Sequence, residues 1–558
     1  MKSDIEIAER AAVRNIAEVA ADIGLGEDDI ERYGKHIAKV PLDVLSRYDS
    51  REDGKLVLVT AVTPTPAGEG KTVTTIGLIQ GLAAIGQKVV GALREPSMGP
   101  TFGMKGGATG GGMSQVYPMW KIDLEFTGDI HAVAAAHNLL SAVLENNLVR
   151  ENPLRIDPSR IVWKKAIDMN CRELRNIVVG LGGGKVEGGV PHESGFIITS
   201  ASEISAILAL STSYKNLRRR LERVVVAYTY DNEPVTAGQL GCVGSMMVLL
   251  RDALMPNLVQ TLEGQPVFVH GFPFANIAHG NNSVIATRYA MKLGDIAVTE
   301  AGFAADLGGE KFMDIVCRQS GIRADCVVLV ASVRALMMHG GADLDDPGTF
   351  DEESLVRGME NLDRHVANMK SYGLPVVVSI NHFASDAPEH VRLIREHCRS
   401  MGAECVQSDA FAHGGAGAKE LAEKVVEVLG RTKAGYVPAY PDDAPLKEKI
   451  ESVAKRIYGA DGVSYSPQAE RSIRRLVEQG YGNLPVCIAK TQYSISDNPD
   501  LKGAPGGWAL SVREVSLSAG AGFIVPVCGK IMLMPGLSKE PAALRIDLAD
   551  DGSIVGLK

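Results

Sequence analysis

The sequence has no excess of basic residues. Its 58 lysines and arginines are outnumbered by 67 aspartates and glutamates, so the formal net charge is −9. Proteins that bind nucleic acids or anionic membranes usually present a basic patch to the phosphates of their partner. The charge balance therefore predicts that the chain has no nucleic-acid partner and no membrane partner.

Cysteine and long apolar runs are also scarce. The eight cysteines are scattered without a C-x-x-C pair, which indicates neither a zinc site nor a disulfide framework. The N-terminal residues carry charges at helical spacing instead of the apolar core of a signal peptide. Nowhere do about 18 apolar residues run together, as a membrane-spanning helix would need. These absences predict a cytoplasmic protein with reduced thiols.

Glycine and aliphatic residues, by contrast, are abundant. The 558 residues include 60 glycines, and 45% of the chain is hydrophobic against 22% charged. This composition is typical of an α/β enzyme, and the length predicts about three domains of roughly 100 to 200 residues each. A polar run at 343–354 and a proline-rich run at 436–446 mark the two expected boundaries.

The most informative stretch is KLVLVTAVTPTPAGEGKTVTTIGLIQ, residues 55–80. Its apolar first part predicts a strand buried on both faces of a parallel sheet, and its last part has the apolar spacing of a helix. The glycine-rich turn between them directs backbone N–H groups and a helix N-terminus at one point, which suits a polyphosphate. We therefore predict a nucleotide site that consists of Thr65, Pro66, Ala67, Gly68, Glu69, Gly70, Lys71 and Thr72.

Two side chains of this loop have expected roles. Lys71 supplies a positive charge for the terminal phosphates, and Thr72 supplies a hydroxyl for Mg²⁺. The loop is a variant of the standard P-loop, because the motif G-x-x-x-x-G-K-[ST] would need glycine where this chain has Thr65. The alternative interpretation is an ordinary strand-to-helix turn.

A second parallel strand is predicted at 88–93, and Arg94 and Glu95 follow its end. Ligands of open α/β sheets bind at the carboxyl ends of the strands, so these side chains and the polar loop at 299–311 are expected near Lys71. The planar guanidinium of Arg94 can hold an anion at two points. The alternative role for Arg94 is a structural salt bridge with Glu95 or another carboxylate.

Two further patterns do not predict sites. The stretch 176–189, NIVVGLGGGKVEGG, lacks the third glycine of a dinucleotide fingerprint, because Lys185 and Glu187 stand where it would be needed. His131 and His137 are six residues apart on a predicted helix, so their rings face different directions and cannot share a metal ion as an i, i+4 pair does.

Eight motifs, spread in order over nearly the whole chain, closely resemble formate–tetrahydrofolate ligases. They are TPTPAGEGKT (63–72), LREPSMGPTFGMKGGATGGG (93–112), FTGDIHAVAAAHNLL (126–140), PFANIAHG (273–280), TEAGFAADLGGEKFMDI (299–315), VRALMMHGG (333–341), AKTQYSISD (489–497) and MPGL (534–537). The resemblance implies ligation of formate to N10 of tetrahydrofolate with ATP and Mg²⁺, by way of formyl phosphate. It also implies a homotetramer and leaves open a site for a monovalent cation.

This activity agrees with the residues, because phosphoryl transfer needs positioned charge more than a protein nucleophile. We expect an α/β fold with a large P-loop-type, parallel-sheet ATP-binding and catalytic domain at 1–353. Two smaller α/β domains are expected at 354–446, which contributes to the folate site, and at 447–558. On this basis Lys71 and its loop would hold ATP, and Arg94 would hold formate and the transferred phosphoryl group. The resemblance places the pterin between Phe383 and Phe411.

Several positions depart from the family pattern. They affect the expected aromatic stacking site for the pterin or a site for a monovalent cation. Phe411 stands where tryptophan is usual, and Phe272 stands where glycine is usual, so Phe272 adds volume to any cavity that its loop faces. Two alternatives follow: a related ATP-dependent ligase with another acid or acceptor, and a nucleotide-dependent switch that binds a partner protein. The departing positions are Met113, Glu125, His192, Phe272, Phe411 and Lys530.

Overall fold

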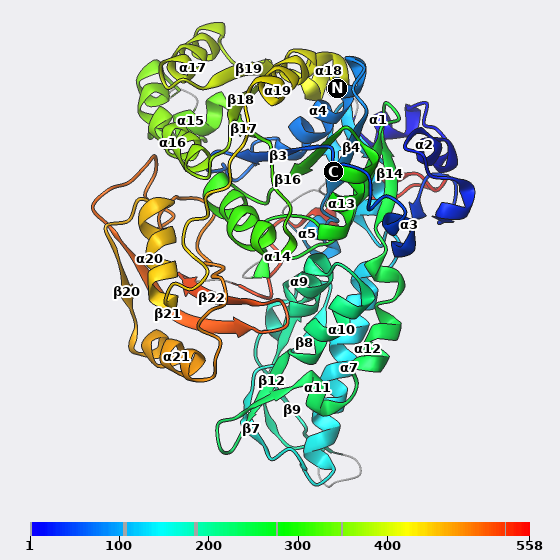
Figure 1. Cartoon of the computed structure of the whole chain (residues 1–558), viewed down its shortest axis with the longest axis vertical. Coiled ribbons are helices and arrows are strands. Elements are labelled where there is room, and N and C mark those ends of the chain that lie inside the picture. The colour runs from blue at the N-terminus through cyan, green and yellow to red at the C-terminus, as the bar shows by residue number, and fades with distance from the viewer. Residues whose placement is uncertain are drawn as a thin grey trace.

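A computed structural model of the chain describes residues 3–103, 109–182, 188–274, 277–346, 350–529 and 532–557. Figure 1 shows a large sheet flanked by helices, an elongated arm below it, and a C-terminal unit beside the arm. The predicted α/β class is confirmed, because the large sheet is mainly parallel and helices cover it. Within the described residues, no helix is both long and apolar enough to span a membrane.

The described strands of the central sheet follow the order β1-β2-β14-β15-β4-β16-β3-β17-β18-β19, and β6 joins β5 to β14. All neighbours from β15 to β19 are parallel. The strands are β1 (Glu31–Arg32), β2 (Ala38–Lys39), β3 (Lys55–Ala61), β4 (Val89–Leu93), β5 (Gly110–Gly111), β6 (Ser114–Tyr117), β14 (Asn257–Thr261), β15 (Pro266–Val269), β16 (Ile296–Glu300), β17 (Cys326–Ala331), β18 (Val376–Asn381) and β19 (Glu404–Ser408).

The apolar runs of the sequence form these central strands because both faces of the sheet are covered. In β3 every residue after Lys55 is buried, and β17 and β18 are buried along their whole length. Continuous Val, Leu and Ile runs suit such positions, where neither face meets water. The strands predicted at 56–62 and 88–93 are thus confirmed, although β16 lies between them in the sheet.

Helices cover the two faces of the sheet. Side chains of β3 alternate between the two cores: Leu56 and Leu58 pack on one face, and Val57 and Val59 pack on the other. The latter face is covered by α4 (Lys71–Ala84), α18 (Ala410–Gly417) and α19 (Lys419–Arg431). The opposite face is covered by α13 (Val284–Leu293), α15 (Val333–His339), α16 (Glu352–Ser371) and α17 (Pro388–Ser400).

The boundary predicted near residue 353 lies between β17 and β18, which are neighbours in one sheet. The strands of 354–446 therefore extend the central sheet and do not form a sheet of their own. The division of the chain at 353 and 446 stays a prediction.

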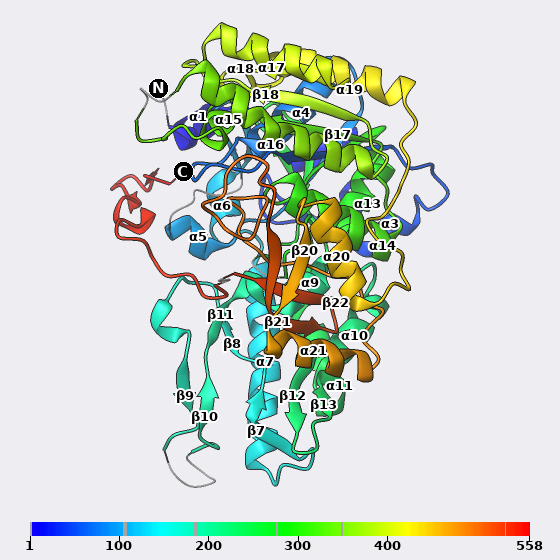
Figure 2. The same cartoon turned by 90° about the vertical axis from the view of Figure 1, so that its left-hand side faces the viewer.

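The arm combines helices with small sheets (Figure 2). His137 is buried in its long helix and hydrogen-bonds Ser202 and the carbonyl of Lys164, whereas His131 is exposed, so the two rings do face different directions. The stretch 176–182 begins with a strand of an antiparallel hairpin, and 183–187 lie outside the described residues. The arm contains α7 (Asp129–Val149), α9 (Glu203–Leu210), α10 (Tyr214–Glu222), α11 (Ala237–Leu240), α12 (Val243–Leu249), β7 (Ile156–Ile161), β8 (Lys165–Ile167), β9 (Ile177–Val179), β10 (His192–Ser194), β11 (Phe196–Ile198), β12 (Val225–Thr229) and β13 (Pro234–Thr236).

The C-terminal unit consists of a small sheet flanked by helices. The apolar start of the segment PVCIAKTQ, residues 485–492, predicts a strand. The segment forms only isolated bridges, from Val486 and Ala489 to the last strand of that sheet. The unit contains α20 (Leu446–Arg456), α21 (Pro467–Glu478), β20 (Gly462–Tyr465), β21 (Ala509–Ser518) and β22 (Phe523–Cys528).

A buried ion pair joins the N-terminal segment to the arm and yields a stability prediction. The Lys39 Nζ lies 2.8 Å from Asp129 Oδ1, and both side chains are almost completely buried. Because an unpaired buried charge is costly, Lys39→Met is expected to lower the free energy of unfolding by about 3 kcal/mol. The double variant Lys39→Met/Asp129→Asn should recover most of that loss in thermal unfolding. Equal melting temperatures for the single and double variants would contradict the prediction.

Candidate active site

A cavity of about 510 Å³ opens at the carboxyl ends of β3, β4 and β16. It brings together the loop that follows β3, the residues that follow β4, and the end of β16. This is the edge at which ligands of open α/β sheets bind. The residues that line the cavity include Pro66 to Val73, Arg94, Glu95, Phe272, Phe274, Glu300 and Phe303.

The loop that follows β3 is shaped by a glycine and by hydrogen bonds of its own residues and its neighbours. Gly70 precedes α4 with a φ of 69°, and a Cβ there would lie 2.2 Å from the Asn381 amide nitrogen, so only glycine fits. Glu69 accepts a hydrogen bond from the Thr65 N–H at 2.7 Å and another from the Ser332 hydroxyl. The Glu69 carboxylate therefore shapes the loop from inside the protein.

Lys71 is the first residue of α4, is half-buried, and lines the cavity. The helix N-terminus and the backbone N–H groups of the loop provide a favourable environment for phosphate oxygens. These are the features that the sequence predicts for residues 65–72.

Thr72 and Glu300 place two oxygen atoms beside the loop. The Thr72 hydroxyl donates a hydrogen bond of 2.9 Å to Glu300 Oε2. A hydroxyl and a carboxylate are oxygen ligands of the kind that Mg²⁺ prefers, so this pair fits the predicted magnesium ligand Thr72. The sequence motif alone assigns no magnesium role to Glu300, although its place at the end of β16 is a signal, because parallel strands end at one edge of the sheet.

Arg94 extends from the end of β4 into the same cavity. Gly302 allows its close approach, since a Cβ at Gly302 would lie 2.9 Å from Arg94 Nη1. Burial lowers the pKa of Arg94, and the carboxylate of Glu300 opposes that effect. In the described part of the chain, the Arg94 guanidinium makes no hydrogen bond or ion pair with Glu95 or with any other residue. The guanidinium is thus available for an anion.

Glu95 is buried beside Arg94, and its Oε2 lacks a hydrogen-bond partner in the described part of the chain. Burial raises the pKa of Glu95 well above its ordinary value, and Asp129 contributes in the same direction, whereas Lys39 opposes it. The fold therefore favours the neutral acid at this position.

Phe383 and Phe411 follow β18 and β19, and both rings are exposed, by 45% and 41%. Their segments touch where His382 hydrogen-bonds Asp409. The Phe411 ring borders the glycine-rich loop, since a Cβ at Gly111 would lie 3.2 Å from Phe411 Cε2. Neither ring lines the cavity of Lys71 and Arg94, but the neighbouring Gly110 does.

The positions that depart from the family pattern lie apart from one another. Phe272 is buried and lines the cavity of Arg94, whereas Met113 and Glu125 are exposed. His192 is buried, with its Nε2 3.5 Å from Glu145 Oε1. Lys530 lies outside the described residues.

The fold and the cavity define an α/β protein with a variant P-loop at the carboxyl edge of a parallel sheet. The chain belongs to the formate–tetrahydrofolate ligase family, whose pattern matches residues 2–558. It is 54% identical over 558 residues to a formate–tetrahydrofolate ligase of Symbiobacterium thermophilum, a match that covers 100% of both chains. It is 52% identical over 557 residues to one of Granulibacter bethesdensis, covering 100% of this chain and 97% of the relative. The predicted family is thus confirmed, and the protein is an enzyme of the ligase class.

The exposed aromatic pair supports a prediction about the folate acceptor. A pterin is flat with apolar faces, and an aromatic contact contributes about 0.5 to 1.5 kcal/mol beyond its area. Phe411→Ala should therefore raise the tetrahydrofolate KM several-fold and leave the ATP KM unchanged, whereas Phe411→Trp should bind folate as well or better. Tyr230→Ala, an exposed aromatic of the arm, is the control in steady-state assays. If neither Phe411 variant alters the folate KM, the pterin binds elsewhere.

Proposed function

We propose that the protein joins formate to N10 of tetrahydrofolate with ATP, by way of formyl phosphate, and releases ADP and phosphate. Family membership supports formate and tetrahydrofolate as the substrates. The observation that carries the ATP-dependent step is the convergence of Lys71, the Thr72–Glu300 pair and Arg94 on one cavity.

The first step is a phosphoryl transfer. A formate oxygen attacks the γ-phosphorus of ATP, the bond to the ADP oxygen breaks, and formyl phosphate forms. Lys71 and the backbone N–H groups of the loop hold the phosphates, while Arg94 orients formate and stabilises the charge of the transferred group. Thr72 and Glu300 would hold Mg²⁺, which supplies further charge neutralisation when bound.

The second step is an acyl transfer. N10 of tetrahydrofolate attacks the formyl carbon, the bond from carbon to the phosphate oxygen breaks, and the proton of N10 passes to the leaving phosphate. Phe383 and Phe411 stack on the pterin, and the cationic side chains that held the γ-phosphate hold the leaving phosphate. A homotetrameric assembly, a cytoplasmic location and a monovalent-cation site are further parts of the proposal.

One assay separates this function from its alternatives. ADP release is measured with ATP, Mg²⁺, formate and tetrahydrofolate, and each component is then omitted in turn. We expect turnover only with all of them present, and 10-formyltetrahydrofolate equal in amount to ADP. Turnover with another acid or amine in place of formate or folate would indicate a ligase of altered specificity. An ATP hydrolysis rate that is the same with and without formate and tetrahydrofolate would favour the nucleotide-dependent switch.

A further inference from the structure

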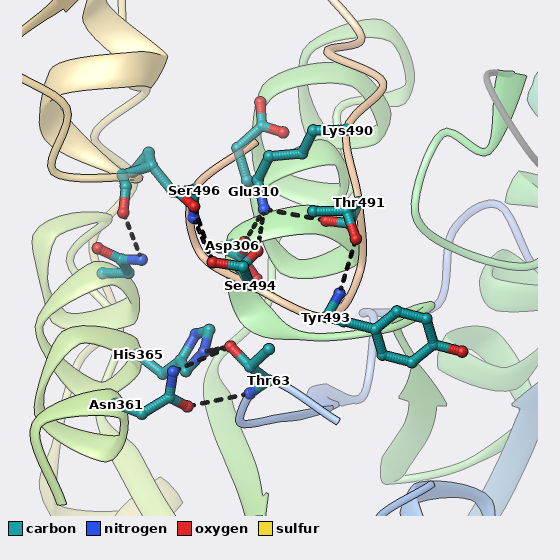
Figure 3. A network of polar contacts seen from close by, with 12 residues as sticks. Thr63, Asp306, Glu310, Asn361, His365, Lys490, Thr491, Tyr493, Ser494 and Ser496 are labelled. Atoms are coloured by element: carbon teal, nitrogen blue, oxygen red, sulfur yellow. Dashed lines mark hydrogen bonds and ion pairs between the residues drawn. The ribbon is translucent and has the colours of Figure 1, made fainter. Parts of the chain in front are cut away.

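The first residue of the sequence TPTPAGEGKT, Thr63, is held by side chains from two helices. Thr63 is buried, and Asn361 and His365 of α16 and His339 of α15 contact it. Figure 3 shows Asn361 and His365 directed at Thr63 from the same helix. Thr63 lies two residues before the predicted phosphate loop, so these contacts fix the point at which the loop leaves β3.

Asn361 connects Thr63 to the C-terminal part of the chain. Its Oδ1 accepts the Thr63 N–H at 3.2 Å, and its Nδ2 donates to Thr63 Oγ1 at 3.0 Å and to the Gly503 carbonyl at 2.8 Å. Both amide protons and the amide oxygen are thus engaged. A buried amide in this position fixes the distance between two backbone segments that are far apart in the sequence.

His339 makes the complementary connection. Its Nε2 lies 3.0 Å from the Thr63 carbonyl oxygen, to which it donates, and its Nδ1 accepts the Gly503 N–H at 3.3 Å. The ring must be neutral to do both, and burial lowers its pKa to about 4, which agrees. Asn361 and His339 together therefore occupy the N–H and the carbonyl of both Thr63 and Gly503.

The segment that presents Gly503 is anchored at its other end. Lys490 is buried, and its Nζ lies 2.8 Å from Asp306 Oδ2 and donates to the Ser494 carbonyl at 2.6 Å. The Ser494 hydroxyl donates to the Leu501 carbonyl at 2.6 Å, which closes the loop on itself. Asp306 belongs to a π-helical turn, η6 (Ala305–Gly309), that follows β16 and Glu300. Figure 3 shows Lys490 reaching from the loop to this turn.

We infer that the loop 490–503 is a brace that positions the phosphate loop, and that Asn361 and His339 are the positioning residues through which it acts. The inference rests on the proposed function, because it presumes that the loop at 65–72 holds ATP. Displacement of a reacting group by about 1 Å can cost about 10²-fold in rate. The motif AKTQYSISD, which the proposed chemistry does not use, has its role in this brace.

The test is Asn361→Asp, which keeps the oxygen that accepts from Thr63 and loses the two donated bonds. The matched control is Asn368→Asp: Asn368 is a buried asparagine on the same helix that donates to the Ile457 carbonyl at 2.9 Å, away from the phosphate loop. We expect kcat/KM for ATP to fall about 10²-fold in Asn361→Asp and to stay near the wild-type value in Asn368→Asp. Melting temperatures should fall in both.

A second pair of variants decides the matter if Asn361→Asp fails to fold. Thr63→Val keeps the shape of the side chain and removes its hydroxyl, whereas Thr63→Ser keeps the hydroxyl. We expect weaker nucleotide binding by calorimetry and a lower kcat in Thr63→Val, with rescue in Thr63→Ser. A folded Asn361→Asp or Thr63→Val protein with wild-type kcat/KM for ATP would overturn the brace. A wild-type protein that binds no ATP would instead overturn the proposed function.

Discussion

Lys71→Ala is expected to reduce ATP-dependent turnover by at least about 10³-fold while the fold stays intact. Lys71 is half-buried at the start of α4 and lines the cavity, so in the proposed mechanism its ammonium would stabilise the charge of the transferred phosphoryl group. Removal of a preorganised charge from such a site raises the barrier, because water in the cavity must reorganise to replace it. ADP release measures the effect, and circular dichroism measures the fold.

Lys88→Ala is the matched control for this change. Lys88 is also half-buried, but it precedes β4. It therefore lies at the amino ends of the parallel strands, whereas the cavity lies at their carboxyl ends. We expect it to retain activity. Activity of Lys71→Ala within about tenfold of the wild type, a difference of about 1.4 kcal/mol in the barrier, would remove Lys71 from the phosphate site.

The strand, turn and helix around Lys71 could be predicted from the sequence because each depends on local pattern. A continuous apolar run requires two covered faces, and the left-handed conformation at Gly70 requires glycine. The ends of β4 and β16 could be placed at the same edge because parallel strands share their direction. Local sequence pattern is therefore sufficient to predict that Lys71, Arg94 and the loop after β16 lie in one region.

The order of the strands could not be predicted in the same way. β16 lies between β3 and β4, and only this order brings Glu300 to Thr72, 228 residues away in the sequence. Asn361 is likewise 298 residues from Thr63. No periodic pattern in the sequence predicts the contact between its amide and Thr63. Such contacts depend on which strands and helices pack together.

The strand expected at 485–492 shows a related limit. The segment has the composition of a strand and runs beside β22, since Cys487 donates to the Ile524 carbonyl and Ala489 to the Pro526 carbonyl. Only isolated bridges form, and Lys490 then turns into the core to meet Asp306. The sequence signal that the strand ends there is the charged lysine that follows the apolar run.

Arg94→Lys is expected to separate nucleotide binding from formate chemistry. Lysine keeps the positive charge but loses the planar fork, so it cannot hold two oxygens of formate or of the phosphoryl group at once. We expect nucleotide affinity near the wild-type value, together with a loss of formate-dependent ADP release of about 10³-fold, the smaller of the effects that arginine contributes in phosphoryl transfer.

The structure makes this variant informative because, in the described part of the chain, the Arg94 guanidinium makes no hydrogen bond and interacts with the Glu300 carboxylate only through its charge. Gly302 leaves room for either side chain. Arg288→Lys is the control: Arg288 is half-buried and donates to the Ser320 carbonyl at 2.8 Å. It should keep both nucleotide affinity and kcat. Calorimetry with ADP and single-turnover ADP release with saturating formate distinguish the two effects of Arg94→Lys. Unchanged kcat and formate KM would mean that the guanidinium has a structural role and that another cation orients the acid.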